Sequence, residues 1–152
     1  MALGKYIDTE IGRLYLAEEN DCIVRLTVDK APEQDELGES SLLQQATAEV
    51  MEYLAGERKT FSIPVRACGT RFQEAVWAAL QRIPFGETRS YGEIAREVGS
   101  PKGARAVGMA CNRNPILLMI PCHRVVGSTG KLVGFACGLP MKQKLLQLEG
   151  QV

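Results

Sequence analysis

The sequence predicts an α/β fold of the α+β kind: a small antiparallel sheet with one helix in residues 1–65, then a mainly helical domain in residues 66–152. Short turn-bounded β segments near the N-terminus and helical spacing of apolar residues further on predict this order. An apolar run over residues 115–122 predicts a buried strand that ends at Cys122. The 152 residues, 45% hydrophobic and 24% charged, exclude collagen, coiled coil and disorder.

The first domain begins with a predicted three-stranded meander, and we expect it to have a structural role. Its strands are expected at Lys5 to Ile7, Gly12 to Ala17 and Cys22 to Val28. Residues 29–39 are acidic and contain Pro and Gly, which predicts a loop. Apolar residues then recur at helical spacing over residues 42–54, with Ser41 as the expected cap and Gly56 as the stop.

The second domain is expected to begin with capped helices. Thr70 and Gln73 form a capping box before an apolar stripe that includes Trp77, a core residue. Ser90 and Glu93 form a second capping box. Two short helices, Tyr91 to Val98 and about Lys102 to Cys111, are joined by a Gly-containing turn, so we expect a helix-turn-helix.

The second helix of this pair has small side chains on its expected outer face. We place Gly103, Ala106, Val107 and Ala110 toward the core, and Ala104, Arg105, Gly108, Cys111 and Asn112 outward. Such a face fits a minor groove about 6 Å wide, where sequence readout is poor. The alternative is close helix packing inside the protein, which small residues also permit.

The net charge of zero hides an asymmetry between the two halves. Residues 1–65 hold 6 Lys and Arg against 13 Asp and Glu, a charge of −7, and residues 66–152 hold 12 against 5, a charge of +7. A basic half is expected of a polyanion binder, although a solvated positive surface explains the charge alone equally well. Motifs must decide between the two.

Composition also excludes several classes of protein. No apolar run approaches the roughly 20 residues that span a bilayer, and we see no signal peptide, so we expect no membrane and a cytoplasmic location, or a nuclear one in a eukaryote. Five cysteines without a CxxC pair predict free thiols. His123 is the single histidine, so we expect no metal and no cofactor.

Cys122 is the candidate nucleophile. Its neighbours His123 and Arg124 are a base and a cation, which activate thiols. On an extended strand, however, successive residues point to opposite faces, so Cys122 and His123 need a sharp turn or a bridging water to exchange a proton. A cysteine in an apolar stretch can equally be an inert core residue.

The string IPCHRVV over residues 120–126 resembles the active-site signature of the O6-alkylguanine-DNA alkyltransferases, single-use DNA repair proteins. The similarity extends over about half the chain. It includes FxxxVWxxLxxIPxGxTxSYGEIA from Phe72, GxPKxARAVGxAxxxNP from Gly99 and GxxGxxxGFxxGLxxKxxLLxxEG near the C-terminus. The resemblance implies a stoichiometric, irreversible methyl- or alkyltransferase that acts as a monomer on double-stranded DNA through the minor groove. Its expected substrate is O6-alkylguanine, with O4-alkylthymine as a further candidate.

The resemblance also implies residue roles. Cys122 accepts the alkyl group, His123 acts on it as a base through a water, Glu149 holds the imidazole, and Asn114 braces the nearby turns. The flipped base is contacted by Tyr91, Val125 and Ala136. The backbone groups of Cys122, Val125 and Ala136 bind the edge of the guanine. Ala104, Arg105 and Gly108 lie against DNA, and Arg105 fills the space of the extruded nucleotide.

Three positions depart from the family pattern: Ala136, Cys137 and Pro140, which would alter the pocket wall. The zinc of some relatives should be missing, because the N-terminal half lacks the ligands. Two rival functions stay open: a cysteine hydrolase that uses Cys122, His123 and Asn114, and a non-catalytic protein that only binds the lesion.

Overall fold

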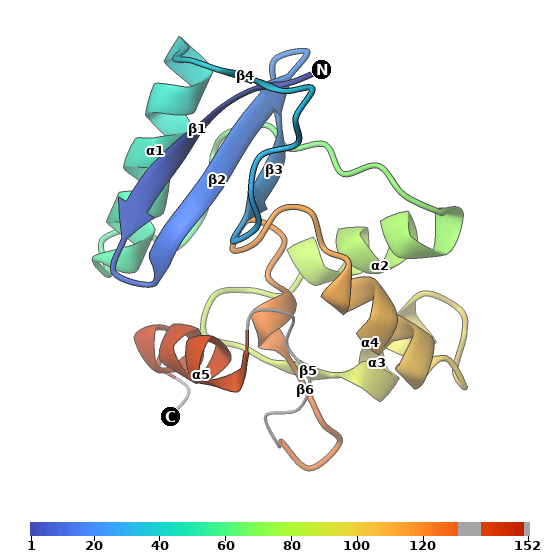
Figure 1. Ribbon diagram of the computed structural model, residues 1–152. Coiled ribbons are helices and arrows are strands. Elements are labelled where there is room, and N and C mark those ends of the chain that lie inside the picture. The colour runs from blue at the N-terminus through green and yellow to red at the C-terminus, as the bar shows by residue number, and fades with distance from the viewer. Residues whose placement is uncertain (131–137, 151–152) are drawn as a thin grey trace. The chain divides into compact units, whose positions relative to one another are not determined.

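The computed structural model describes residues 1–130 and 138–150 (Figure 1). The chain forms two compact units. The N-terminal unit comprises Met1–Ala67 together with Pro115–Leu117, and the C-terminal unit comprises Cys68–Asn114 with Leu118–Val152.

A four-stranded sheet forms the centre of the N-terminal unit. Its strands are β1 (Leu3–Thr9), β2 (Gly12–Glu19), β3 (Cys22–Thr27) and β4 (Glu36–Leu37), in the order β3-β2-β1-β4. The predicted meander of the first three strands is confirmed, and their pairing is antiparallel. Between β2 and β3, Asn20 and Asp21 have φ of 52° and 64°, as the tight turn of a hairpin requires.

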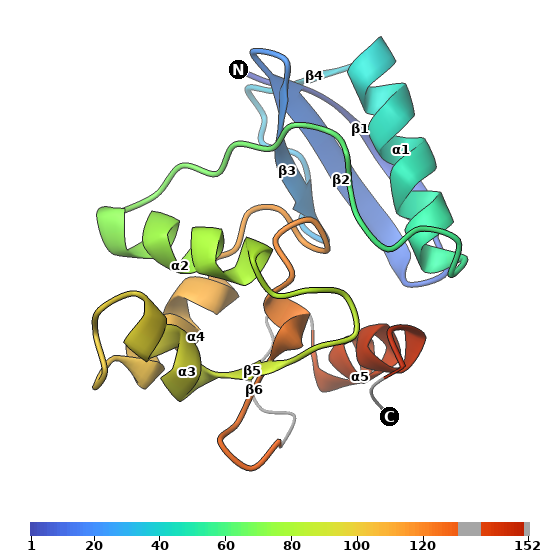
Figure 2. The ribbon, with the colours of Figure 1, turned by 180° about the vertical axis from the view of Figure 1, so that it is seen from behind.

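Two details of this unit differ from the sequence prediction. Residues 29–39 are not entirely loop, because the short strand β4 pairs in parallel with the start of β1. Helix α1 (Ser41–Leu54) is capped by Ser40 instead of Ser41, since the hydroxyl of Ser40 accepts from the Leu43 amide. The helix lies along one face of the sheet (Figures 1 and 2).

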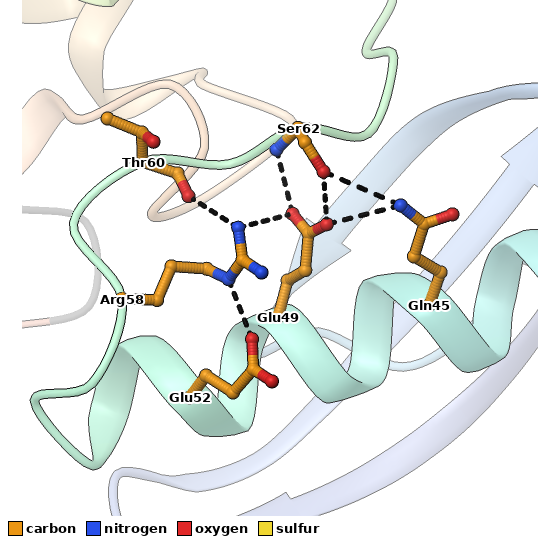
Figure 3. A network of polar contacts seen from close by, with 6 residues as sticks. All are labelled: Gln45, Glu49, Glu52, Arg58, Thr60 and Ser62. Carbon is orange, nitrogen blue, oxygen red and sulfur yellow. Dashed lines mark hydrogen bonds and ion pairs between the residues drawn. The ribbon is translucent and has the colours of Figure 1, made fainter.

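A buried carboxylate fastens the segment after α1 to the helix (Figure 3). Oε1 of Glu49 accepts from the Ser62 amide at 2.8 Å, and Oε2 accepts from the Ser62 hydroxyl and from Gln45 at 3.2 Å. Arg58 lies 3.7 Å from Glu49 and bonds Glu52 at 2.7 Å. Burial raises the pKa of Glu49, but these donors together hold it below its usual value.

The C-terminal unit begins with three helices: α2 (Arg71–Gln81), α3 (Tyr91–Glu97) and α4 (Ala104–Asn112). Both predicted capping boxes are present, at Thr70 and at Ser90. Trp77 is in the core as predicted, and its indole nitrogen donates to the Ala110 carbonyl at 2.9 Å. Helices α3 and α4 pack together in the predicted helix-turn-helix.

The predicted orientation of α4 is partly wrong. Cys111 is buried instead of outward, and Ala106 is exposed instead of buried. The buried face is therefore Val107, Ala110 and Cys111. The Trp77 bond to Ala110 is consistent with this orientation, because it places that part of α4 against α2.

The predicted strand before Cys122 does not form. Residues 116–120 are buried, but only Ile116 makes a bridge, with Leu26, and both of these residues belong to the N-terminal unit. Leu118 has φ of 68°, which is not the backbone conformation of a strand. Cys122 opens a 3-10 turn, η1 (Cys122–Arg124), and the short strand β6 (Val125–Val126) follows it.

The last elements of the C-terminal unit place the chain around η1. Strand β5 (Arg89–Ser90) pairs in parallel with β6, so the start of α3 lies beside the end of η1. Helix α5 (Leu139–Leu148) packs against η1 (Figure 1). No helix in the described part of the chain is both long and apolar enough to cross a bilayer.

Candidate active site

The thiol of Cys122 lies at the first position of η1. The Cys122 amide donates to the Ile120 carbonyl at 2.8 Å, and the Arg124 amide donates to Pro121 at 3.0 Å, which closes the turn. Cys122 is 3% exposed. Because the backbone turns here, Cys122 and His123 are not on opposite faces of a strand. The extended backbone that would have kept their side chains apart is therefore absent at this position.

Asn114 braces the segment that leads to the nucleophile. Its Nδ2 donates to the Ile120 carbonyl at 2.7 Å, the same carbonyl that accepts from the Cys122 amide. Its own amide donates to the Cys111 carbonyl at 3.2 Å, at the end of α4. Asn114 thus ties the backbone before Cys122 to the helix-turn-helix.

His123 and Glu149 form a buried pair. Nε2 of His123 lies 2.8 Å from Oε2 of Glu149, and both side chains are almost fully buried. Burial lowers the pKa of His123 although Glu149 opposes the shift, so the imidazole is neutral near pH 7. With its Nε2 proton donated to the carboxylate, the ring keeps a lone pair on Nδ1 that can accept a proton.

Arg124 holds Glu149 from a second side. Its Nε donates to Oε1 at 2.8 Å and its Nη2 to Oε2 at 3.0 Å, a bidentate contact. Nη1 donates to the Ile83 carbonyl at 2.6 Å, and the guanidinium lies 5.9 Å from the Phe85 ring centroid. The Gly86 amide also reaches Oε1 at 3.4 Å. The carboxylate that orients His123 is therefore fixed by the loop after α2.

Sequence reasoning treated Arg124 only as a cation beside the thiol and missed this role. It also missed Lys142, which is fully buried in α5. Lys142 Nζ lies 3.4 Å from the Tyr91 hydroxyl. The signal was present, because Lys142, Leu145, Leu146 and Glu149 share one face of a helix.

Burial shifts the pKa of Tyr91 and the pKa of Lys142 in opposite directions. Burial, together with the neighbouring thiols of Cys111 and Cys122, raises the pKa of Tyr91 to about 12, so its hydroxyl keeps its proton and can donate it. Burial lowers the pKa of Lys142, and the same two thiols partly oppose that shift. A hydroxyl donor and an amine therefore lie close to the Cys122 sulfur.

Cys111 is a second thiol in this cluster but is suited to the core. Burial, with a smaller effect of Cys122, raises the pKa of Cys111 to about 12. A thiol that stays protonated is a poor nucleophile. Of these two thiols, only Cys122 directly precedes the buried His123.

The remaining predicted site residues lie on α4 and β6. Arg105 is exposed, whereas Ala104 and Gly108 are half-buried. Gly108 lies close to Tyr91, since a Cβ there would be 3.8 Å from the ring. Val125 is buried at the start of β6, and Ala136, with Cys137, lies outside the described residues. Within residues 1–130 and 138–150, no group of three or more His, Cys, Asp or Glu side chains is arranged to hold a metal ion.

Both halves of the chain match the domain models of one protein family. Residues 71–151 match the model of the 6-O-methylguanine DNA methyltransferase, DNA binding domain, and residues 3–67 match that of the same family's ribonuclease-like domain. A methylated-DNA–protein-cysteine methyltransferase of Methanosarcina acetivorans is 44% identical over 148 residues, covering 94% of this chain and 95% of the relative. A protein of that name from Mycobacterium leprae is 47% identical, with 94% and 89% covered.

The solved structures agree as well. The crystal structure of Mycobacterium tuberculosis OGT in complex with DNA superposes with a TM-score of 0.91 at 41% identity, covering 97% of this chain and 92% of that one. The predicted α/β class is thereby confirmed. The chain belongs to the 6-O-methylguanine DNA methyltransferase family.

Proposed function

We propose that this protein repairs DNA by moving the alkyl group of O6-alkylguanine onto Cys122, once per molecule. The observation that carries the proposal is a thiol at the start of a turn, followed at once by an imidazole that a buried carboxylate orients at 2.8 Å. Membership of the family supplies the reaction, DNA repair by alkyl transfer to a cysteine.

The reaction is a displacement at the alkyl carbon. The sulfur of Cys122 forms a bond to that carbon as the bond from carbon to guanine O6 breaks, and the electron pair stays on the guanine. His123 takes the thiol proton through a water, and the Tyr91 hydroxyl donates a hydrogen bond to the leaving base. The guanine then takes up one proton, which balances the proton that the thiol lost. Overall, the thiol proton replaces the alkyl group on guanine, so no cofactor is needed. The thioether has no easy reversal, which makes each molecule single-use.

Charged side chains position the residues that take part in the reaction. Arg124 holds the Glu149 carboxylate in place, and Glu149 in turn fixes the tautomer of His123. Lys142 holds the Tyr91 hydroxyl and places positive charge near the sulfur, where negative charge develops as the thiol loses its proton.

DNA is the macromolecular partner, and we propose that α4 enters its minor groove. The half-buried Ala104 and Gly108 allow the helix to approach the sugar-phosphate walls, and the exposed Arg105 fills the space that the extruded nucleotide leaves. Contacts of this kind read charge and shape, so affinity should fall steeply with salt and vary little with flanking sequence. We further propose that the protein acts as a monomer.

The position of Asn114 argues against a cysteine hydrolase. Its Nδ2 donates to the backbone of Ile120, where it supports the turn before Cys122. Glu149 orients the imidazole. A hydrolase would also need an oxyanion hole and repeated turnover.

The test uses duplex DNA that carries a labelled O6-methyl group. We expect label on the protein to level off at one methyl per molecule, and Cys122→Ser to bind the duplex without transfer. Labelled methanol released over many turnovers would indicate a hydrolase instead. Binding of the lesion by the wild type without any transfer would indicate a lesion-binding protein.

A further inference from the structure

The outer face of α4 carries a large apolar side chain that the proposed mechanism does not use. Met109 is 58% exposed. In the described part of the C-terminal unit, the only other exposed large hydrophobic residue is Leu139, which is 45% exposed at the start of α5. The buried residues Val107, Ala110 and Cys111 occupy the opposite side of α4, so Met109 makes no contribution to the core there.

Two arginines flank Met109 along the helix. Arg105 lies one turn before it and Arg113, the C-cap residue, one turn after it, and both are exposed. In residues 1–130 and 138–150, neither guanidinium has an ion pair or a side-chain hydrogen bond. By contrast, Arg82 and Arg89 of the same unit pair with Glu97 and Glu87. The stripe Arg105, Met109 and Arg113 is thus positively charged at both ends and apolar in the middle.

This pattern suits a narrow groove with charged walls. Side chains one helical turn apart are about 5–6 Å from each other at Cβ, whereas base pairs repeat every 3.4 Å or so along the duplex. If Arg105 fills the space of the extruded nucleotide, Met109 can therefore reach the neighbouring base step. Proteins that bend DNA from the minor groove use apolar wedges of this type, and a methionine adapts its shape to irregular surfaces.

We propose that Met109 is an apolar wedge that packs in the minor groove beside the site of base extrusion, with Arg113 on a flanking phosphate. The inference rests on the proposed function and extends it. The occupant of the stripe is duplex DNA, because unpaired positive charge surrounds the apolar residue and the stripe continues from Arg105. Met109 widens the opened step, and Arg113 fixes the register of α4 on the backbone.

The two residues are expected to leave different signatures in salt titrations of DNA binding. Met109→Ala should weaken binding of an O6-methylguanine duplex about tenfold at every salt concentration, since a methionine packed against DNA contributes apolar contact and no phosphate contact. Arg113→Ala should weaken binding and also flatten the slope of log K against log salt by about 0.9. Met109→Leu should restore binding to within about twofold of the wild type.

A matched control is Met51→Ala, which removes a 39% exposed methionine from a helix of the N-terminal unit. It should bind and repair the duplex like the wild type. A fluorescent base analogue next to the lesion should report less unstacking with Met109→Ala than with this control.

Wild-type affinity in Met109→Ala would overturn the inference, as would a slope change equal to that of Arg113→Ala. A change in oligomeric state with unchanged DNA binding would assign Met109 to a contact between protein copies instead. Neither result would affect the proposed function, because that fails only if the wild type and Met51→Ala transfer no methyl group from the duplex.

Discussion

Each of the two units buries a glutamate beside an arginine, but the two carboxylates differ in function. Glu49 accepts hydrogen bonds from Ser62 and Gln45 and forms an ion pair with Arg58, and all three groups keep their protonation state near neutral pH (Figure 3). Glu149 accepts from His123 and Arg124. A buried carboxylate with an arginine is therefore no sign of catalysis; the imidazole that follows a thiol makes the difference.

The arginines differ as well. The side chain of Arg58 is 29% exposed, whereas that of Arg124 is 8% exposed. Water can partly solvate Arg58 if its partner is lost, but Arg124 would stay buried and unpaired. Disrupting the Arg124–Glu149 pair should therefore cost more unfolding free energy than disrupting the Arg58–Glu49 pair. Only the loss of the Arg124–Glu149 pair should also slow methyl transfer.

The largest expected effect is that of Glu149→Gln. Leaving Arg124 buried without its charge partner should cost about 3 kcal/mol of unfolding free energy. The rate of methyl transfer should fall about 100-fold, because an imidazole without a negative partner is a weaker proton acceptor. The pH at which the rate reaches its plateau should also shift upward. Denaturant titration and single-turnover kinetics measure these effects. A variant with the wild-type pH profile would remove Glu149 from the proton relay formed by Cys122, a water, His123 and Glu149.

Exchanging each arginine for lysine should separate the two networks further. Arg124→Lys loses the bidentate contact with Glu149 and the bond to Ile83, which should cost about 2 kcal/mol. Arg58→Lys, at a partly solvated site, should cost clearly less than Arg124→Lys. Thermal unfolding of both variants provides the measurement. Equal losses would contradict the distinction drawn between the two sites.

Glu49→Gln should affect stability alone. It weakens the contacts to Ser62 and Arg58, with an expected cost of about 1–2 kcal/mol. The methyl transfer rate of the folded variant should equal that of the wild type. A reduced rate at full occupancy of the folded state would show that the N-terminal network also supports the reaction.

The smallest effect is a pH dependence of stability that stems from His123. Burial lowers the pKa of His123 in the folded protein below its usual 6.5 or so, so the unfolded chain binds this proton first as pH falls. Stability should be full above about pH 6.5 and decline as pH drops below it. Because the sequence has one histidine, His123→Gln should remove this slope below about pH 6.5. If the slope persisted in the variant, other titratable groups would be its source.

Local signals in the sequence were sufficient for much of the fold. The capping boxes at Thr70 and Ser90 mark the starts of α2 and α3, because the cap and its partner are only three residues apart. Alternation and turn residues likewise predict the three antiparallel strands. The resemblance supplied Glu149, which no local pattern links to His123.

Features that depend on contacts distant in sequence could not be predicted. The run before Cys122 has the composition of a buried strand, and only the positive φ of Leu118 and the bond from Asn114 turn it into an irregular segment. The clamp of Arg124 on Glu149 joins η1 to the end of α5, so it needs the tertiary fold. Burial of Lys142 conflicts with the usual exposure of lysine.

The most direct test of the central claim is to locate the transferred methyl group. The wild type is reacted with duplex DNA that carries O6-methylguanine, then digested, and each cysteine-containing peptide is analysed by mass spectrometry. We predict one methyl group, on Cys122, with the peptides of the other four cysteines unchanged. Methyl on Cys111 or Cys137, with Cys122 unmodified, would contradict the assignment of the nucleophile and of the relay built on it.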